Sequence, residues 1–453
     1  MRSKWKNLPL EEAMDAIIDY RGKTPKKTER GIPLITAKIV KNGRIKPTQE
    51  YIAEADYDSW MQRGIPQKGD IVLTTEAPLG EVAQLNGDKI ALAQRIITLR
   101  GKSGLLESDF LKYLLQSNDV QHQLDGRASG TTVSGIKQSE LRKIILNFPP
   151  LSDQKAIAHI LGSLDDKIEL NRRMNATLEG MAQALFKSWF VDFGPVIDNT
   201  IVAGNPIPDE LTERAEIRSK ALADGSANRE AAKSFPTAFQ FTEKMGWIPE
   251  GWEVATLGDY LEVKRGGSPR PIHDFLRPKG LPWVKIADAT ASTSRFLFTT
   301  KAFIKPEGLR KTVLMKKGSL ILSNSATPGL PIFLELDACI HDGWLHFPKK
   351  RYFGDLYFYQ LFLVIREELV NQGSGSVFTN LKTDILRAQR IVVPPSPLLK
   401  EFEGWMKPNF EKILSLNIEI RTLTNLRDTL LPKLISGEIR IPDAEKYIKE
   451  TIA

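Results

Sequence analysis

Two stretches of the chain carry apolar residues at steps of three and four, which predicts two long helices. The first covers residues 151–190 and the second residues 397–435. The spacing is typical of a coiled-coil seam. We predict Ser152 as N-cap of the first helix, and we expect Pro408 to interrupt the second and Pro432 to bend its last turn. The seam positions are Ile157, Leu161, Leu164, Ile168, Met174, Leu178, Met181, Leu185 and Trp189 in the first helix, and Phe402, Trp405, Ile413, Leu416, Ile420, Leu423, Leu430 and Leu434 in the second.

Shorter apolar runs precede each long helix and predict strands. Examples are IVLTT at 71–75 and SLILSN at 319–324, and Gly, Pro, Ser and Thr separate such runs. Two amphipathic stretches, ESDFLKYLLQS at 107–117 and FGDLYFYQLFLVIREEL at 353–369, predict helices at matching places. A mixed region of strands and helices, called a head below, therefore comes before each long helix.

The two halves of the chain repeat each other in order. GIPLITAKI matches GLPWVKIAD, KGDIVLT matches KGSLILS, and SGTTVSGIKQSEL matches SGSVFTNLKTDIL, always at an offset between about 244 and 249 residues. Such collinear matches indicate a duplication of one long unit. We predict a first head at 1–147, a spacer helix at 148–192, a connector with an extra helix at 193–246, a second head at 247–392, a second spacer helix at 393–441 and a tail at 442–453.

The two long helices are expected to pack on each other, because neither can bury its seam alone. Equivalent units related by a pseudo-two-fold axis would make the helices antiparallel. Helices of about 39 residues give a rod of roughly 58 Å, longer than the ~34 Å of one DNA turn. The predicted fold class is α+β, with two mixed heads held apart by two antiparallel coiled-coil helices. Asn171 and its match Asn417 either fix the helix register or lie on a solvated shoulder of the seam.

Composition narrows the class of protein without deciding it. Of 453 residues, 42% are hydrophobic and 26% charged, as in soluble globular proteins. No apolar run reaches the length of a bilayer span, and the start MRSKWKNLPLEE is not a signal peptide. The single cysteine, Cys339, excludes a disulfide framework, so we expect a cytoplasmic location. The net charge of +8 suits contact with DNA phosphates but is equally common in proteins with no such role.

The sequence lacks the common catalytic motifs. It has no GxxxxGK[ST], no GxGxxG after a strand and no GxSxG, and its NFPP at 147–150 departs from the amino-methyltransferase motif. His341 and His346 with Asp342 form the one close histidine pair, for which a packing or surface role is favoured over metal binding. We predict no catalytic residue, metal or cofactor in this chain. A duplicated DNA-modifying enzyme and a helical adaptor that binds only proteins remain alternatives.

Loops at equivalent places in both heads carry the candidate DNA contacts. Lysine and arginine would hold phosphates, whereas Asn, Glu, Thr and selected Arg could read base edges. For any single cation a solvated surface position is the simpler reading, but the repeated loops keep their backbone signals and change their side chains. The candidates are Arg21, Lys23, Lys38, Lys41, Arg44, Thr74, Thr75, Glu76, Thr131, Thr132 and Ser134 in the first head, and Arg265, Arg270, Lys285, Ser323, Asn324, Ser325, Ser374 and Ser376 in the second.

These residues resemble a known family, the specificity (S) subunits of type I restriction–modification systems. PPLSDQKAIAHILGSLDDKIELNRRMNATLEGMAQALFKSWFVDFGP at 149–195 is similar to the central conserved region of that family, and NLRDTLLPKLISGEIRI at 425–441 to its C-terminal one. KGDIVLTTEAPLG is similar to an element of its target-recognition domains. The second head departs from this pattern at SNSATPGLPIF, and the connector departs from it by the extra helix at 208–233.

The resemblance implies partners and a division of labour. It implies two target-recognition domains, a helical spacer, binding of double-stranded DNA and a complex with two modification subunits. Those subunits bind S-adenosylmethionine and methylate adenines, and restriction subunits complete the assembly. Phe186, Trp189 and Phe190 are candidates for docking the modification subunits on the outer face of the helix pair. The alternative is that these aromatic residues seal the junction with the neighbouring head.

Overall fold

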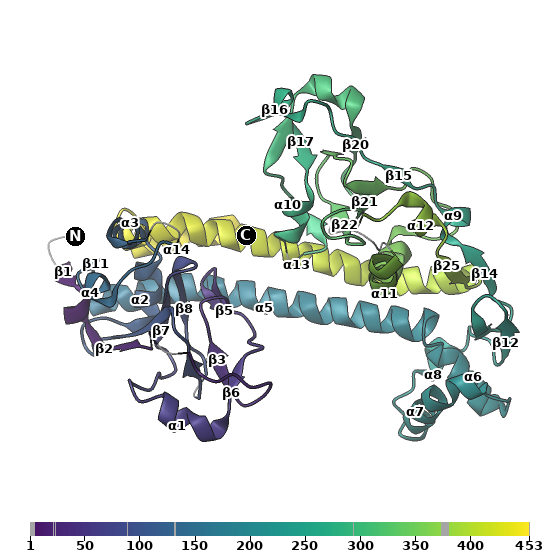
Figure 1. Cartoon of the computed structure of the whole chain (residues 1–453), viewed down its shortest axis with the longest axis horizontal. Helices are drawn as coiled ribbons and strands as arrows, with labels where there is room; N and C mark the ends of the chain where they lie inside the picture. Colours follow the sequence, from purple (N-terminus) through teal and green to yellow (C-terminus); the bar gives the residue numbers. More distant parts are fainter. Residues whose placement is uncertain are drawn as a thin grey trace. The chain divides into compact units, whose positions relative to one another are not determined.

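The computed structural model describes residues 5–20, 22, 24–87, 89–130, 133–292, 294–372 and 380–452. The chain divides into two compact units (Figure 1). The first combines Met1–Leu170 with Glu419–Ala453, and the second is Asn171–Ile418. The long helices α5 (Leu151–Phe190) and α13 (Ser396–Ser436) each contribute one part to each unit. The two units are described separately below.

The first unit is built on a four-stranded antiparallel sheet. Its order is β2 (Met14–Asp19), β10 (Ile96–Gly101), β7 (Ile71–Thr75) and β8 (Leu79–Gln84). The smaller sheets are β6 (Tyr51–Ile52), β3 (Ile32–Ile35) and β9 (Ala91–Leu92); β4 (Val40–Lys41) with β5 (Arg44–Ile45); and β1 (Lys6–Pro9) with β11 (Ile145–Phe148). The helices besides the long ones are α1 (Tyr57–Trp60), α2 (Ser108–Leu115), α3 (Asn118–Arg127), α4 (Gln138–Leu141) and α14 (Ile441–Ile452).

The strand β7 shows why this sheet forms. Ile71, Val72 and Leu73 are fully buried, because both faces of the strand are covered. Ile71 and Leu73 belong to a core that also contains α2 and the long helices, whereas Val72 faces a second core with β3 and β9. A continuous apolar run is what a strand buried on both faces requires, so IVLTT is confirmed as a strand.

The second unit contains the second head and the connector. It has two five-stranded sheets. The order of the first is β15 (Lys264–Arg265), β24 (Trp344–His346), β21 (Leu320–Ser323), β22 (Pro331–Leu334) and β18 (Phe296–Leu297). The order of the second is β16 (Leu276–Arg277), β19 (Ala302–Ile304), β17 (Leu281–Val284), β23 (Ala338–Ile340) and β20 (Val313–Met315). The two-stranded sheets are β14 (Glu253–Thr256) with β25 (Arg390–Val393) and β12 (Phe239–Thr242) with β13 (Gly246–Pro249). The helices are α6 (Gly194–Ala203), α7 (Thr212–Ala223), α8 (Arg229–Ala232), α9 (Leu257–Tyr260), α10 (Ile286–Thr290), α11 (Asp355–Gln372) and α12 (Thr383–Arg387).

The two heads share one topology. The sheet order β2-β10-β7-β8 of the first head recurs as β15-β24-β21-β22 in the second, and the pair β1–β11 recurs as β14–β25. The helices α2 and α11 follow the main sheet in the same way. The predicted duplication is therefore present in the fold as well as in the sequence.

The long helices run antiparallel in each unit. In the first unit, Arg427 Nη1 lies 2.7 Å from Asp165 Oδ1. In the second, Asn409 Nδ2 donates to Leu178 O at 3.3 Å, and the rings of Phe186 and Phe402 lie 5.8 Å apart. Residue numbers rise along α5 as they fall along α13, which confirms the predicted antiparallel pairing.

Two predictions about helix ends and prolines were wrong. The N–H groups of Asp153 and Gln154 donate to Pro150 O, so α5 begins at Leu151 and Ser152 is its second residue, not its cap. α13 continues through Pro408, which removes only one intrahelical hydrogen bond. Phe402 and Met406 are buried before the proline, and this packing keeps the helix continuous. The helix also continues through Pro432 to Ser436.

The two repeated asparagines have different surroundings. Asn171 is fully buried, and among the described residues its side-chain amide has no hydrogen-bond partner. Asn417 is half-buried, and its Nδ2 donates to Ile413 O at 2.8 Å. The register set by the pairs 178–409 and 186–402 brings Asn171 level with Asn417. Asn171 therefore occupies the seam and not its solvated shoulder.

The connector forms two helices where one was expected. The predicted polar helix at 208–233 is divided into α7 and α8. α7 is attached to α6 through Arg218 Nε and Asp198 Oδ1, which lie 2.8 Å apart, and Asp198 is buried. None of the described helices is long and apolar enough to cross a membrane.

Candidate nucleic-acid interface

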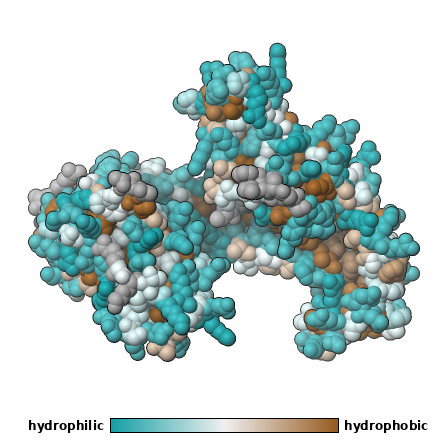
Figure 2. Space-filling model, in the orientation of Figure 1, coloured by the Kyte–Doolittle hydropathy of each residue, from teal (hydrophilic) through white to brown (hydrophobic). Residues whose placement is uncertain are grey.

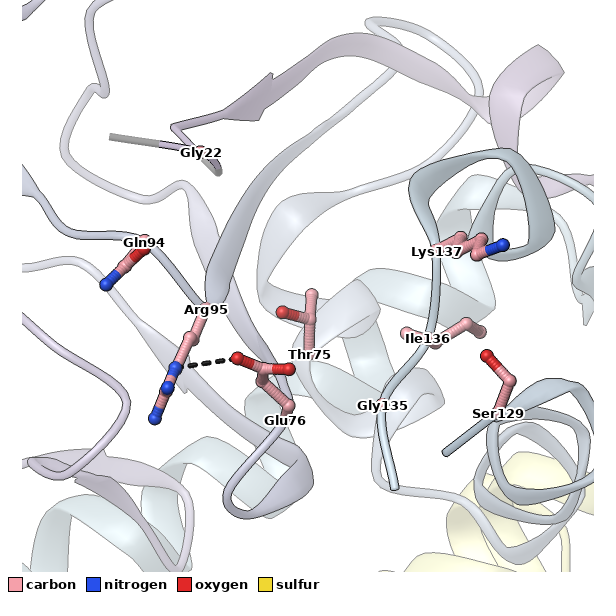
Figure 3. A pocket seen from close by; sticks show the side chains of 9 residues that line it. All are labelled: Gly22, Thr75, Glu76, Gln94, Arg95, Ser129, Gly135, Ile136 and Lys137. Carbon is pink, nitrogen blue, oxygen red and sulfur yellow. Dashed lines mark ion pairs between the residues drawn. The ribbon is translucent and has the colours of Figure 1, made fainter. Parts of the chain in front are cut away.

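A polar pocket of about 290 Å³ lies at the end of strand β7 in the first head. We call it the first loop site (Figure 3). It brings together three segments, 75–76 at the end of β7 and the loops 94–95 and 129–137, and Gly22 of a fourth segment also lines it. Its lining residues are Gly22, Thr75, Glu76, Gln94, Arg95, Ser129, Gly135, Ile136 and Lys137.

Backbone hydrogen bonds hold these three loops together. The N–H of Thr75 donates to Arg95 O at 2.9 Å, and the N–H of Ile136 donates to Thr75 O at 3.0 Å. Arg95 and Ala77 have φ values of 73° and 50°. Non-glycine residues in this left-handed region cost free energy and often occur where a backbone must present a side chain to a ligand.

The side chains of the first loop site are charged. Arg95 Nε lies 2.6 Å from Glu76 Oε1, and the side chains are 52% and 39% exposed. In Figure 3 one nitrogen of Arg95 faces the Glu76 carboxylate, and the rest of the guanidinium points away from it. Thr75 is buried, and among the described residues its hydroxyl has no hydrogen-bond partner.

The second head has the same backbone arrangement at the end of β21. The N–H of Asn324 donates to Gly343 O at 2.9 Å, and the N–H of Leu381 donates to Asn324 O at 2.7 Å. Ala326, with φ of 58°, stands where the first head has Ala77. We call this the second loop site: Asn324, Ser325, Asp342 and Gly343 with Ser268 and Arg270.

The side chains of the second loop site are different. Asn324 Nδ2 donates to Asp342 O at 3.2 Å, while its Oδ1 is buried with no partner among the described residues. Ser268 Oγ donates to the Asp342 carboxylate at 2.7 Å, and Arg270 Nη2 lies 3.3 Å from it. Burial raises the pKa of Asp342, but Ser268, His341 and Arg270 outweigh it and hold the pKa below its usual value. This carboxylate is therefore ionised at neutral pH.

Three predicted DNA contacts have hydrogen-bond partners within the protein. Thr74 and Ser323 are buried, and their hydroxyls accept the N–H groups of Glu81 and Leu330 at 2.9 and 2.8 Å. Both lie one residue before the positions of Thr75 and Asn324 in their loop sites, so the structure presents neither side chain at the surface, contrary to the predicted DNA contact. Arg44 Nη1 lies 2.8 Å from Glu169 Oε2 of α5 and joins the β4–β5 hairpin to the helix.

Other predicted cations are exposed and suit contact with phosphates. They are Lys38, Lys41, Arg265, Arg270 and Lys285. On the face shown in Figure 2 most of the surface is hydrophilic. Ser134 and Ser325 are at least partly exposed. The candidates Arg21, Lys23, Thr131, Thr132, Ser374 and Ser376 lie outside the described residues.

Sequence reasoning missed Gln94, Arg95 and Lys137. The signal for the first two was a polar pair directly before the apolar strand β10, which pairs with β7. Recognising it requires the strand pairing, because residues about 20 apart in sequence meet at the site. Lys137 directly follows the repeated SGTTVSGI loop and could have been included with it.

The aromatic residues predicted for partner docking are buried. Phe186, Trp189 and Phe190 are 1%, 3% and 7% exposed. They pack against Phe402, and Phe190 also lies 5.2 Å from the ring of Tyr357 in α11. An outer docking surface made of these residues is therefore excluded, and the alternative, a seal at the junction with the neighbouring head, fits the structure.

Both loop sites consist of polar groups that can form hydrogen bonds with a ligand. Among the described residues no group of three or more His, Cys, Asp and Glu side chains is arranged to hold a metal ion. His341 Nδ1 accepts the N–H of Gly343 at 2.7 Å, and burial lowers the pKa of His341. Its role in the structure is to shape the second loop site. The sites offer carboxylate, amide, hydroxyl and guanidinium groups on fixed backbones, as readers of base edges do.

Comparison with known proteins identifies the protein family, and that family agrees with the duplicated heads and the loop sites. The model of the type I restriction modification DNA specificity domain matches residues 2–180 and 249–398, and the chain belongs to this family. The predicted resemblance is confirmed, and each head matches the domain once.

Individual relatives agree over most of their length. The type I restriction enzyme MjaIX specificity subunit of Methanocaldococcus jannaschii is 27% identical over 427 residues, which cover 91% of this chain and 88% of that protein. The HindI specificity subunit of Haemophilus influenzae is 27% identical over 412 residues, covering 82% and 87%. The crystal structure of a type I S subunit from M. genitalium shows a similar fold, with a TM-score of 0.55 and 17% identity over 95% of this chain and 96% of that one.

Proposed function

We propose that this chain is the DNA-recognition subunit of a type I restriction–modification complex. It reads a bipartite, asymmetric target, one half-site with each head, and it presents that target to modification subunits that carry the catalytic residues. One observation carries the proposal: the two loop sites have the same backbone hydrogen bonds but different side chains. Two readers with one scaffold and different chemistry suit a target whose halves differ in sequence.

The division of labour follows from what the loop sites offer. Their groups can bind and position DNA, and the proposal leaves methyl transfer and S-adenosylmethionine to two modification subunits. Restriction subunits would join the same assembly. The exposed lysines and arginines of the heads would hold phosphates and set the register of each head on the duplex.

Partner docking is assigned to exposed apolar residues of the helix pair in the second unit. The seam prediction was wrong for Met181 of α5 and Trp405 of α13, because each side chain is 59% exposed. They lie level with each other, because the pair 178–409 fixes the register nearby. Exposed aromatic and methionine side chains are enriched at protein interfaces. We assign docking to these two residues in place of the buried aromatic cluster.

A head exchange tests the reading of two half-sites. The chain is expressed with its modification subunits, and methylated adenines in the cell are located by sequencing. Replacing residues 1–147 with the matching head of a relative should change one half of the methylated sequence and keep the other. Replacing 247–392 is the matched control and should change the opposite half. A change of both halves by either exchange would contradict independent reading.

Two binding assays separate the proposal from its alternatives. A gel shift with random-sequence DNA that weakens steeply with salt is expected, and its absence would favour an adaptor that binds only proteins. The purified chain should transfer no label from S-adenosylmethionine to DNA. Transfer in the absence of partner subunits would favour a duplicated DNA-modifying enzyme.

A further inference from the structure

The ion pair of the first loop site is exposed and contributes little to the fold. Arg95 and Glu76 are 52% and 39% exposed, and ion pairs with this exposure typically stabilise proteins by less than about 1 kcal/mol. Yet Arg95 adopts a left-handed backbone conformation with φ of 73°, which is unfavourable for a residue with a side chain. A cost without a matching gain in stability points to a role in binding.

The backbone that carries the two side chains is held in place before any ligand arrives. Thr75, next to Glu76, is bonded through its backbone to Arg95 on one side and to Ile136 on the other. Gly135 pairs with Glu76 across an isolated bridge, and a Cβ at Gly135 would lie 3.1 Å from Glu76 Cβ. The close approach needs glycine, and it holds Glu76 against the loop. Preorganised side chains lose less conformational entropy on binding.

Resting on the proposed function, we infer that Arg95 and Glu76 read one G·C base pair of the first half-site in the major groove. Arg95 is paired with Glu76 through its inner nitrogen, Nε. Its two terminal nitrogens are left to donate parallel hydrogen bonds to guanine O6 and N7. The carboxylate of Glu76 accepts from N4 of the cytosine in the same pair. An adenine would present its N6 donor to the guanidinium, which has no acceptor.

A contact with the DNA backbone explains the site less well. Glu76 Oε1 lies 2.6 Å from the guanidinium, and its charge would repel a phosphate placed there. Lys137 also lines the pocket but lies away from Arg95 and Glu76 in Figure 3, and it suits a phosphate better. The carboxylate has a purpose only if the ligand also offers a hydrogen-bond donor, which a base pair does and a phosphate does not.

The second head cannot make this contact from the matching backbone position. Gly343 occupies the position that Arg95 has in the first head. The carbonyl of Gly343 accepts the N–H of Asn324, just as the carbonyl of Arg95 accepts the N–H of Thr75. A Cβ at Gly343 would lie 2.2 Å from the His341 ring and 2.6 Å from Ser325 Oγ. No side chain fits there. A contact through this backbone position therefore belongs to the first half-site alone, because the exposed guanidinium of the second loop site, Arg270, comes from a different loop.

The test uses the complete complex with its modification subunits. The methylated motif is sequenced for R95A, R95K and E76Q, and binding to duplexes with each base pair at each position is measured. R95A should lose discrimination at one G·C position of the first half-site by about 5- to 150-fold, the value of one bidentate contact. R95K keeps the charge but lacks the fork, and it should lose nearly as much. E76Q should relax the same position by less.

A matched control and two outcomes decide whether Arg95 and Glu76 read a G·C base pair. K137A, at another residue that lines the pocket, should weaken binding to all sequences equally and leave the motif unchanged. If R95K and R95A kept every G·C requirement, or weakened all sequences equally as K137A does, the inference would be overturned while the proposed function stood. If the wild-type complex methylated no bipartite motif, the proposed function itself would fail.

Discussion

The two loop sites have one backbone and two chemistries. In each head the residue at, or directly after, the end of the central strand donates to a carbonyl across the sheet and accepts from a third loop, and an alanine nearby has a positive φ. Both sites place a carboxylate and a guanidinium on this frame but take them from different loops, and the second adds the buried amide of Asn324. The comparison teaches that duplication preserved the backbone of the loop sites and left their side chains free to change.

The heads also differ in how they are attached to the long helices. Arg295 of the second head is buried, pairs with Glu179 of α5 and lies 4.5 Å from the Tyr359 ring. Burial lowers its pKa to about 10, so it stays charged at neutral pH. In the first unit the charge at the long helices is the carboxylate of Asp165, which is 19% exposed and has two cations, Lys112 at 2.6 Å and Arg427 at 2.7 Å.

Removing one cation should therefore harm the second unit more than the first. R295A leaves Glu179 facing a cavity, and we expect a loss of about 3–5 kcal/mol in the free energy of unfolding. R427A leaves Lys112 with Asp165, and we expect a loss of about 1–2 kcal/mol. Urea unfolding followed by hydrogen exchange of peptides from each unit measures both. The double variant R295M/E179L should recover most of the loss, and equal losses in R295A and R427A would contradict the difference.

The paired asparagines offer a smaller test within the helix pair. Asn171 is buried without a hydrogen-bond partner among the described residues, whereas Asn417 is half-buried and bonded to Ile413 O. N171L should raise the free energy of unfolding by about 1–2 kcal/mol, because it removes an unsatisfied buried amide. N417L should change it by less than about 0.5 kcal/mol. Thermal unfolding measures both, and a destabilised N171L would show that the amide has a partner in solution.

Acid should act on the first unit through Asp165. Burial raises the pKa of Asp165, but Lys112 and Arg427 outweigh burial and hold the pKa below 3.8. A lowered pKa contributes stability above the unfolded value, and this stability is lost as pH falls below 3.8 through the folded pKa. Unfolding midpoints between pH 5 and 2 should fall less for D165N than for the wild type. Parallel curves would show that Asp165 is not the sensitive group.

The smallest expected difference concerns phosphates, where the two heads should behave alike. K38A in the first head and K285A in the second each remove one exposed cation. Each should reduce the slope of log affinity against log salt by about 0.9 and leave the methylated motif unchanged. Fluorescence anisotropy over a range of salt concentrations measures the slope. A change of motif in either variant would show a base contact instead.

Much of the fold could be predicted because its signals are local. Most of the α5 seam and the strand run at β7 follow from the spacing of neighbouring residues, and the duplication doubled the evidence for each. Met174 and Met181 were wrongly placed in the seam, since they are 37% and 59% exposed. Pro408 was misjudged because its effect depends on packing by Phe402 and Met406, which a sequence does not show. The repeat located the loop sites through their backbone signals.

The side chains of the sites were harder to predict. Arg95 reaches Glu76 only through the pairing of β10 with β7. Thr74 and Thr75 are neighbours of one type, and the alternation of the strand decides which of them lines the pocket. Phe186 and Trp189 are apolar in either role, so composition could not distinguish a buried junction from a docking surface.

The division of the chain has a consequence for the order of folding. The second unit is one continuous segment, whereas the first needs residues from both sides of it. At synthesis rates of about 5–20 residues per second, the 248 residues 171–418 take roughly 12–50 s to emerge. During that time the apolar seam of α5 before residue 171 waits for Leu423, Leu426 and Leu430. The first unit to be translated is therefore the last to be completed, and until then its uncovered seam is the part of the nascent chain most open to chaperones and to aggregation.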